Sequence, residues 1–415
     1  MVVAEHYRRG GCLERAIAPY TCAAEQALAA HDLDAALERV RLAIGCRAEG
    51  VALGTLHGLC CMAHFWRDDF EAGYTHGALA LSLLPPGEQR YMQALGNMLT
   101  FTSLLGKHAE FRRLVGDFGV LTPSPKALGA YVEAASLLVS MFSFGGSRGA
   151  AEGFLRRLLL TGQPLFDRDP VARAWARQAQ VIFLLMLDDD VKQARQLASE
   201  GLDATLESGS RHHQILISAF LGMAYAVEGN HAQAESVLRG NLANAQALHE
   251  PLSINHAQAW LALALSRRDD DARVAEAGRL AVELLQSRGA NAFYVLAAQV
   301  ALSAARLRAG DLAGAAAAYQ AGSSLHAYLP TLHCAAMTTQ LVVLQRLGQA
   351  DELARLAAQA REVLLTVGVA GLADAPLRAT LAAIAPVAQS GTGGQGGGVL
   401  GGDGGQAAAD ERAER

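Results

Sequence analysis

Apolar residues recur along the chain at helical spacing, and short polar or glycine-containing corners interrupt them at regular intervals. The corners recur every 37 to 43 residues, at His31-Asp32, Asp68-Asp69, Gly106-Lys107, Gly145-Gly146, Asp188 to Asp190, Gly229-Asn230, Asp269 to Asp271, Gly310-Asp311 and Gly348-Gln349. Between corners, the apolar stripes fit pairs of amphipathic helices of roughly 14 to 18 residues each. A period of about 40 residues indicates a repeat array. The pattern therefore predicts about nine helical hairpins between residues 13 and 388.

One unit, QILISAFLGMAYAVEGNHAQAESVLRGN at 214–241, shows what a hairpin contains. Its first helix carries the small Gly222 and the aromatic Tyr225, and its second helix carries Ala234 and Leu238. Small residues let two helices approach closely, and large residues fill the joint to the next hairpin. This arrangement resembles the tetratricopeptide repeat (TPR). The resemblance implies an all-α, right-handed superhelical solenoid of about nine TPR-like hairpins, to which the composition adds a disordered Gly-rich C-terminal tail.

The unit around Gly310-Asp311 follows the same plan with one departure. Ala315 is expected to let the second helix close on the first, and Tyr319 is expected to fill the joint to the next unit. Arg306 occupies the position that the repeat gives to an aromatic residue.

The corners and the change in composition divide the chain into four segments. TPR-like hairpins are expected at 1–142 and again at 171–388, with an irregular hinge or atypical repeat at 143–170 between them. The tail, 389–415, is rich in glycine, has no periodicity and carries almost no apolar mass, so disorder is predicted there.

Composition agrees with a helical chain and excludes several classes of protein. Hydrophobic residues make up 51% of the chain and aromatic residues 6%, and much of the hydrophobic share is Ala and Leu, both strong helix formers. The formal net charge of −5, with no long basic block, disfavours a nucleic-acid surface. The N-terminus lacks the apolar core of a signal peptide, and no apolar run approaches the roughly 18 residues of a bilayer span. A cytoplasmic protein without membrane or nucleic-acid contact is expected.

Six cysteines are present without any CxxC pair, at Cys12, Cys22, Cys46, Cys60, Cys61 and Cys334. Reduced, buried thiols are the expectation, and a metal or redox site is the alternative.

The first 45 residues carry a second resemblance. The chain has Ala4, His6-Tyr7, Gly10-Gly11, Arg15-Ala16, Tyr20, the run Ala23 to Leu28, and Asp32-Leu33 followed by Ala35 to Leu37. This pattern resembles the segment that follows the ATPase module in large bacterial signalling proteins. In that family a Ser/Thr kinase or a DNA-binding domain is joined to an AAA-type (STAND) ATPase and then to a helical repeat array, as in regulators of the LuxR and maltose-activator type.

The catalytic parts of that family have no counterpart in this sequence. It contains no GxxxxGK[ST] phosphate loop, no HRD or DFG kinase motif and no recognisable helix-turn-helix. The resemblance therefore implies the sensor arm of such a system, with a protein or peptide partner such as its ATPase or kinase domain, and it implies neither kinase nor ATPase activity.

Histidines and carboxylates are numerous, but their spacing predicts no catalytic, cofactor or metal site. His212 and His213 are adjacent and point to different faces of a helix, while Pro251 separates His249 from His256, and no HExxH motif occurs. Most histidines are expected at the surface or in packing positions. The acidic runs Asp188–Asp190 and Asp269–Asp271 are expected to cap helices rather than bind a cation, although a divalent cation is the alternative.

The remaining candidate surface is the concave face, which the first helix of each hairpin lines in TPR arrays. The candidate groove residues are Leu216, Ala219, Met223, Asn255, Gln258, Asn291 and Tyr294. For the last four, plain solvent exposure without a role is the alternative. Two functions remain open, a non-catalytic protein-interaction scaffold and a sensor that binds a small effector inside the superhelix, and an enzyme with an all-α active site is disfavoured.

Overall fold

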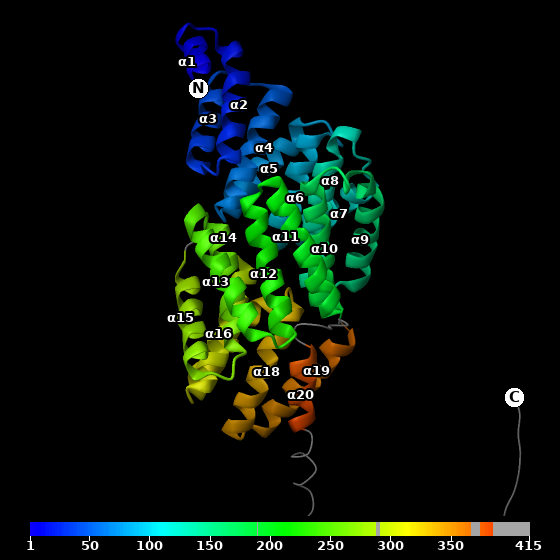
Figure 1. The fold of residues 1–415 in the computed structure, drawn as a ribbon, viewed down its shortest axis with the longest axis vertical. Coiled ribbons are helices and arrows are strands. Elements are labelled where there is room, and N and C mark those ends of the chain that lie inside the picture. Colours follow the sequence, from blue (N-terminus) through cyan, green and yellow to red (C-terminus); the bar gives the residue numbers. More distant parts are fainter. Residues whose placement is uncertain (189, 288–290, 367–373, 385–415) are drawn as a thin grey trace, which may run out of the picture.

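The computed structural model describes residues 1–188, 190–287, 291–366 and 374–384, and every regular element in these ranges is a helix (Figure 1). The first helices of successive hairpins are α2 (Leu13–Ala29), α4 (Gly50–Trp66), α6 (Gln89–Leu104), α8 (Leu128–Phe144), α10 (Pro170–Leu187), α12 (Arg211–Val227), α14 (Pro251–Ser266), α16 (Ala292–Arg308) and α18 (Pro330–Leu347). The second helices are α3 (Leu33–Gly45), α5 (Phe70–Leu83), α7 (His108–Val120), α9 (Arg148–Gly162), α11 (Val191–Ser208), α13 (His231–Leu248), α15 (Asp271–Gln286), α17 (Leu312–Ala321) and α19 (Ala350–Thr366). The short α1 (Val2–Arg9) precedes the first hairpin, and α20 (Asp374–Ile384) follows the last. Single 3₁₀ turns lie at η1 (Pro125–Ala127), η2 (Gln163–Leu165) and η3 (Ser323–Leu325).

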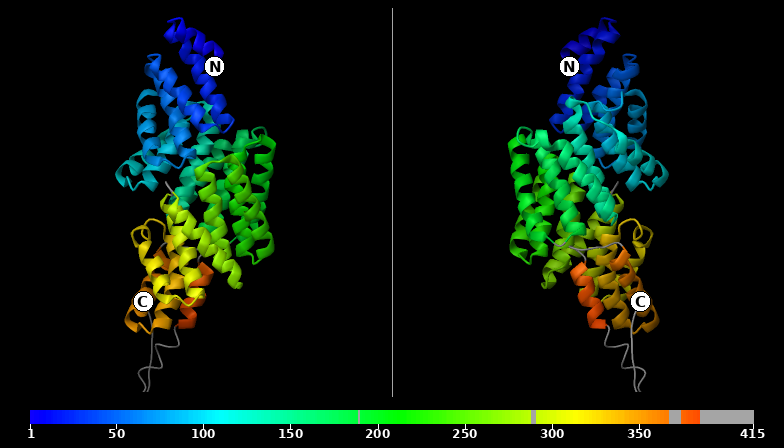
Figure 2. Two further views of the ribbon diagram at one scale, coloured as in Figure 1. Left: turned by 90° about the vertical axis from the view of Figure 1, so that its left-hand side faces the viewer. Right: turned by 90° about the vertical axis from the view of Figure 1, so that its right-hand side faces the viewer.

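The nine hairpins turn at the nine corners that the sequence pattern marks. The fold is therefore confirmed as an all-α, right-handed solenoid of TPR-like hairpins. Figures 1 and 2 place α1–α3 at one end of the long axis and α18–α20 at the other, with the remaining hairpins winding between them.

Most corners place a residue with left-handed backbone immediately before the residue that begins the next helix, and at several corners that next residue caps the helix with its side chain. Gly310 has φ 80°, a conformation that glycine adopts without steric cost. The next residue, Asp311, accepts a hydrogen bond from the backbone N–H of Gly314 at 2.8 Å and so caps α17. Asp190 and Asp270 cap α11 and α15 in the same way, which confirms the prediction that the acidic runs begin helices.

Small residues sit where hairpin helices cross. A Cβ placed on Gly222 of α12 would meet the buried side chain of Leu238 of α13 at 2.5 Å, so only glycine allows this approach. In the Gly310 unit, Ala315 is fully buried, and Tyr319 packs against the cluster of apolar side chains from α18, α19 and α20. Both positions therefore act as the repeat pattern predicts.

The superhelix returns on itself after five hairpins. The first helix α4 touches α14, and α8 touches α18. Across the second of these contacts, Thr331 Oγ1 donates to the carbonyl of Phe144 at 3.2 Å, and the ring of Phe144 also lies 4.6 Å from that of Phe293 in α16. Because these turns touch each other, the first helices of successive turns face a common interior.

The segment 143–170 contains the end of α8, the corner at Gly145-Gly146, α9 and η2, so it forms one hairpin and a short connection to α10. Whether it acts as a hinge stays a prediction. The Gly-rich tail at 389–415 lies outside the described residues.

Within the described residues, one helical stretch, Pro125–Phe144, is long and apolar enough to cross a bilayer by length and composition. It is 67% buried inside the array, where it packs between α6, α9 and α10 as a core helix.

The six cysteines are free thiols. Burial raises the pKa of both Cys60 and Cys61 to about 12. The expectation of buried thiols is wrong for Cys12 and Cys22, which are exposed.

Candidate functional site

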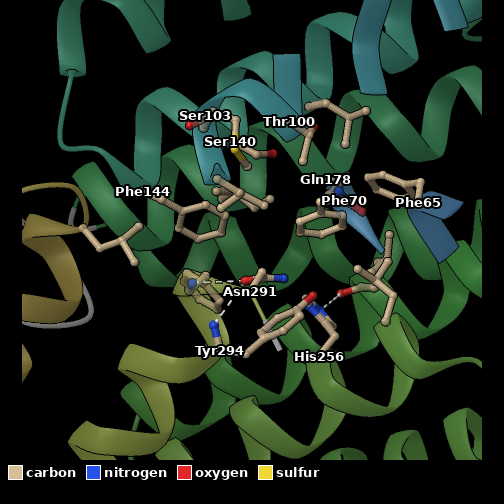
Figure 3. Close-up of a pocket in the computed structure, with 18 of the residues that line it drawn as sticks. Phe65, Phe70, Thr100, Ser103, Ser140, Phe144, Gln178, His256, Asn291 and Tyr294 are labelled. Atoms are coloured by element: carbon tan, nitrogen blue, oxygen red, sulfur yellow. Dashed lines mark hydrogen bonds between the residues drawn. The ribbon is translucent and has the colours of Figure 1, made fainter. Parts of the chain in front are cut away.

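The first helices converge on a cavity of about 110 Å³ inside the superhelix (Figure 3). Its walls come from elements between α4 and α16 and from the segment before α18, so slightly more than one full turn of the array contributes. The lining is mainly apolar and aromatic, with rings from Phe65, Phe70, Phe144, Phe220, Phe293 and Tyr294. A small cavity with aromatic walls and few polar groups is the usual setting for binding one apolar group.

His256 and Tyr294 form a polar pair in this wall. His256 Nε2 lies 3.3 Å from the carbonyl oxygen of Leu216, and the Tyr294 hydroxyl lies 3.4 Å from His256 Nδ1. Burial lowers the pKa of His256 to about 4, so the ring is neutral at neutral pH. A neutral ring satisfies both contacts if Nε2–H donates to the carbonyl and Nδ1 accepts from the tyrosine.

The corner between α4 and α5 reaches the rim of the cavity through Asp68. This residue has φ 58°, and it occupies the left-handed position that glycine fills at corners such as Gly106 and Gly310. Aspartate tolerates this conformation better than most side chains. Because glycine has no side chain, only a residue such as Asp68 can present a functional group from this point of the hairpin.

Two amides hold the Asp68 carboxylate. Asn255 Nδ2 donates to Asp68 Oδ2 at 2.9 Å, and Asn291 Nδ2 donates to Asp68 Oδ1 at 3.4 Å. The side-chain oxygen Oδ1 of Asn291 accepts hydrogen bonds from the backbone N–H groups of Phe293 and Tyr294, so the side-chain NH₂ is turned toward the Asp68 carboxylate. Asp68 is only 3% exposed, and burial raises its pKa to about 6 although both amides lower it. The carboxylate is therefore placed to change charge just below neutral pH.

Beyond Asp68 lies an outer cleft of about 730 Å³, which shares Phe70, Leu104 and Asn291 with the cavity wall. Asp69 and Glu71 are exposed along it. The one basic residue of its lining, Arg67, pairs with Asp34 at 2.7 Å, outside the lining. The outer cleft is thus acidic, while the inner cavity is apolar.

The seven groove residues expected from the sequence divide into three groups. Leu216, Asn291 and Tyr294 line the cavity, and Asn255 lies next to it through Asp68. Ala219 and Met223 are fully buried and do not line it. Gln258 faces away, because its NH₂ donates to the carbonyl of Leu280 in α15 at 2.9 Å.

The alternative of plain solvent exposure is wrong for all four polar or aromatic candidates. Asn255, Gln258, Asn291 and Tyr294 are each exposed by no more than 9%. Asn255 and Asn291 are buried through their contacts with Asp68 across the closed superhelix, which repeat spacing alone does not indicate, whereas Gln258 is buried against α15 of its own hairpin.

Asp68 and His256 were not among the expected groove residues. The repeat pattern predicts only a corner at Asp68, and His256 is among the histidines expected at the surface or in packing positions. A signal for Asp68 does exist in the sequence, since most corners place glycine before the capping residue but this one places aspartate there. The described residues contain one group of three side chains able to hold a metal, at His31, His212 and Glu250, and it lies outside this cavity.

Known proteins resemble this chain in fold but not in sequence. No protein-family model and no curated protein matches it. A crystal structure of a Rap protein complexed with Competence and Sporulation Factor is similar, with a TM-score of 0.53 and 12% identity over 81% of this chain and 93% of that chain. The structure of yeast Tom70 has a TM-score of 0.30 and 12% identity over 91% of this chain and 96% of its own. The P58(IPK) TPR domain has a TM-score of 0.28 and 14% identity over 91% and 99%. At this identity the likeness to the Rap protein establishes a TPR-like helical array and no activity.

Proposed function

We propose that this chain is a non-catalytic protein-interaction scaffold that binds a peptide segment of its partner at the interior of the superhelix. The observation that carries the proposal is the pairing of a small apolar cavity with an acidic outer cleft across a shared wall of Phe70, Leu104 and Asn291. A peptide can place one apolar side chain in the first and a basic group in the second.

The size of the cavity favours a single side chain over a metabolite. An apolar cavity of about 150 Å³ holds one benzene molecule, whereas pockets for drug-sized ligands are about 300–1,000 Å³. At about 110 Å³, the cavity accommodates a side chain of roughly leucine size. The larger outer cleft has room for the adjoining backbone and neighbouring residues.

The charge of the outer cleft indicates the second feature of the ligand. Asp69 and Glu71 face the cleft, and Asp68 lies at its inner end. These carboxylates favour a ligand with a lysine, an arginine or a free amino terminus one or two residues from the apolar anchor. Complementary charge contributes specificity and a faster association rate more than affinity.

The partner is proposed to belong to a bacterial signalling ATPase or kinase system in the cytoplasm. Support comes from the pattern between Ala4 and Leu37, which resembles the segment following a STAND ATPase module. The Rap protein, with a similar fold, was solved in complex with a factor. A coding region for such an ATPase next to this gene would support the assignment, and its absence from the surrounding DNA would count against it.

A panel of fluorescently labelled pentapeptides, varied at one apolar and one charged position, tests the binding mode. The strongest binding is expected for a leucine- or methionine-sized anchor next to a basic residue. Replacing Ser103, which lines the cavity, by leucine should fill the space and weaken binding at least tenfold. The matched control is Ser266→Leu at the end of α14, because this serine does not line the cavity.

Three outcomes would contradict the proposal. One is equal peptide affinity in the Ser103→Leu and Ser266→Leu proteins. Another is saturable thermal stabilisation by a metabolite with no response to any peptide, which would identify an effector sensor instead. Measured ATP hydrolysis by the purified chain would refute the non-catalytic assignment.

A further inference from the structure

A second polar cluster lies where the first hairpin meets the middle of the array. His31 stands at the corner between α2 and α3, His212 lies in the first turn of α12, and Glu250 is the residue immediately before α14. His31 has φ 63°, so it is the second corner residue that replaces glycine with a side chain directed at another hairpin. Three separate hairpins thus bring one functional group each to a single point.

The donor atoms of these residues are close enough to share one ion. His212 Nδ1 lies 2.7 Å from Glu250 Oε2, and His31 Nδ1 lies 3.4 Å from Glu250 Oε1. One donor atom from each residue falls within 4.8 Å of the other two. Around a tetrahedral zinc ion with bonds of about 2.0–2.1 Å, ligand atoms are about 3.4 Å apart. Small side-chain adjustments therefore produce the required geometry.

Glu250 supplies the observation that points to a ligand. Its side chain is 1% exposed, and among the described residues its Oε1 makes no hydrogen bond, only the 3.4 Å ion-pair contact with His31 Nδ1. The Nδ1 atom of His31 is likewise buried without a hydrogen bond there. Leaving buried polar atoms unsatisfied costs roughly 1–3 kcal/mol each, and more for a charged group. A cation bound between Oε1 and His31 Nδ1 would satisfy both atoms.

We propose that His31, His212 and Glu250 form a binding site for a divalent transition metal, with Zn²⁺ as the best match. Two imidazoles and one carboxylate are a ligand set that zinc accepts, with a fourth position left for water. Calcium and magnesium prefer sites made of oxygen ligands, so they are disfavoured. Burial lowers the pKa of His31, which keeps this ligand in the neutral form that metals require.

Surrounding contacts already orient the ligands. Ser253 Oγ donates to Glu250 Oε2 at 3.0 Å, which fixes the carboxylate. The indole of Trp66 stacks on the His212 ring, with centroids 4.1 Å apart and 17° between the planes. Supporting contacts of this kind hold ligands in place and tune metal affinity.

The bound ion would fasten the N-terminal hairpin to the rest of the array. Its ligands join the corner between α2 and α3 to the starts of α12 and α14. The outer cleft is formed at the following corner, between α4 and α5. Zinc would thus favour the closed superhelix by binding the folded state. The metal site stands on its own geometry and does not depend on the proposed peptide binding.

Isothermal titration of the full, chelator-treated chain with ZnCl₂ tests the site. The variant Glu250→Gln keeps the size of the side chain and removes its charge, and His31→Asn keeps a residue that tolerates positive φ. The control is His249→Asn, because His249 also has a positive φ of 56° and lies next to Glu250 but is outside the cluster. Other histidines such as His57 and His76, whose Nδ1 atoms are 2.8 Å apart, can also take up zinc. The test therefore compares the number of zinc equivalents bound by each variant with that bound by the wild type.

The wild-type chain and the His249→Asn control should bind one more tight equivalent of zinc than Glu250→Gln and His31→Asn. Loss of a supporting contact weakens metal sites about 10- to 100-fold, so loss of a ligand should cost at least about 100-fold in affinity. Zinc should also slow hydrogen exchange in residues 13–45 of the wild type but not of the two ligand variants. Equal zinc stoichiometry in all four folded proteins, verified by circular dichroism, would overturn the site.

Discussion

Asp68 accepts a hydrogen bond from Asn255 at 2.9 Å, although 187 positions of sequence separate them. The contact joins the second hairpin corner to the first helix of the seventh hairpin, so it is part of the closure that turns a groove into a cavity. It also places the carboxylate at the boundary between the apolar cavity and the acidic outer cleft. Closure of the superhelix and formation of the binding site therefore depend on the same side chain.

Ionisation of Asp68 should lower the stability of the wild-type protein relative to Asp68→Asn as pH rises. Its pKa is raised in the folded state from 3.8 to about 6, so the folded state holds the proton more tightly than the unfolded state. Stability is then lost between about pH 4 and pH 6 and changes no further above that window. A shift of about two units corresponds to at most about 3 kcal/mol, measured as the difference in unfolding free energy between the two proteins.

Groups that titrate equally in the wild type and in Asp68→Asn cancel in the difference between the two unfolding free energies. The pKa values of His76 and His256 are lowered to about 4, so they act in the opposite direction, and they act in both proteins. Asp69, Glu71 and Arg67 also face the cleft and are retained in both. A pH-independent difference for Asp68→Asn would show that the carboxylate is not perturbed.

Asn291→Ala should destabilise the fold more than an ordinary loss of a helix cap. Asn291 caps α16 through its carbonyl oxygen and supports Asp68 through its NH₂, whereas the exposed Asn230 only caps α13. A lost cap costs about 1 kcal/mol, and a buried acceptor left unsatisfied costs about 1–3 kcal/mol more. Urea unfolding at pH 7 should therefore give about 2–4 kcal/mol for Asn291→Ala and about 1 kcal/mol for Asn230→Ala. Equal losses would mean that Asp68 does not need this amide.

The hairpin architecture could be predicted from sequence because each unit is built by local contacts. Gly310-Asp311 turns and caps one hairpin within five residues, and Gly222 meets Leu238 of the same hairpin. Such contacts recur with the repeat period, so the pattern of corners is sufficient to number the hairpins and assign their helices.

The interior of the superhelix could not be predicted in the same way, because it depends on how far each hairpin rotates relative to the last. Small rotations accumulate over five hairpins before α4 meets α14. A slightly wider superhelix would leave Asp68 in solvent and His31 far from Glu250. The spacing of corners carries no information on that rotation, and so the concave-face residues could be named only in part.

Gly222→Ala should destabilise the protein although alanine is the better helix former. The added Cβ would lie 2.5 Å from the Leu238 side chain, which is fully buried, so the leucine or the two helices would have to shift. Overpacking of this kind costs about 1–3 kcal/mol, which exceeds the gain in helix propensity of up to about 1 kcal/mol. Thermal unfolding should show the loss.

Gly240→Ala is the matched control for that change. Gly240 lies within α13, and a Cβ there meets nothing within 4 Å. Only the helix propensity changes, so the variant should be more stable than wild type by about 0.5–1 kcal/mol. If both alanine variants gain stability, the close approach of α12 and α13 is not limited by this glycine.

Reversing the charge of Glu71 should weaken binding of a basic peptide without disturbing the fold. Glu71 is exposed on the outer cleft, in the first turn of α5, and Glu352 has the same exposure in the first turn of α19, away from the cleft. Either change to lysine opposes the helix dipole and costs about 0.3–1 kcal/mol of stability. Only Glu71→Lys should reduce peptide affinity, by several-fold at low salt and less at 0.5 M NaCl, because added salt screens exposed charges. Fluorescence anisotropy at the two salt concentrations measures this difference. Equal affinities of the two lysine variants at low salt would place the basic group of the ligand outside this cleft and would remove the charge argument for a basic peptide.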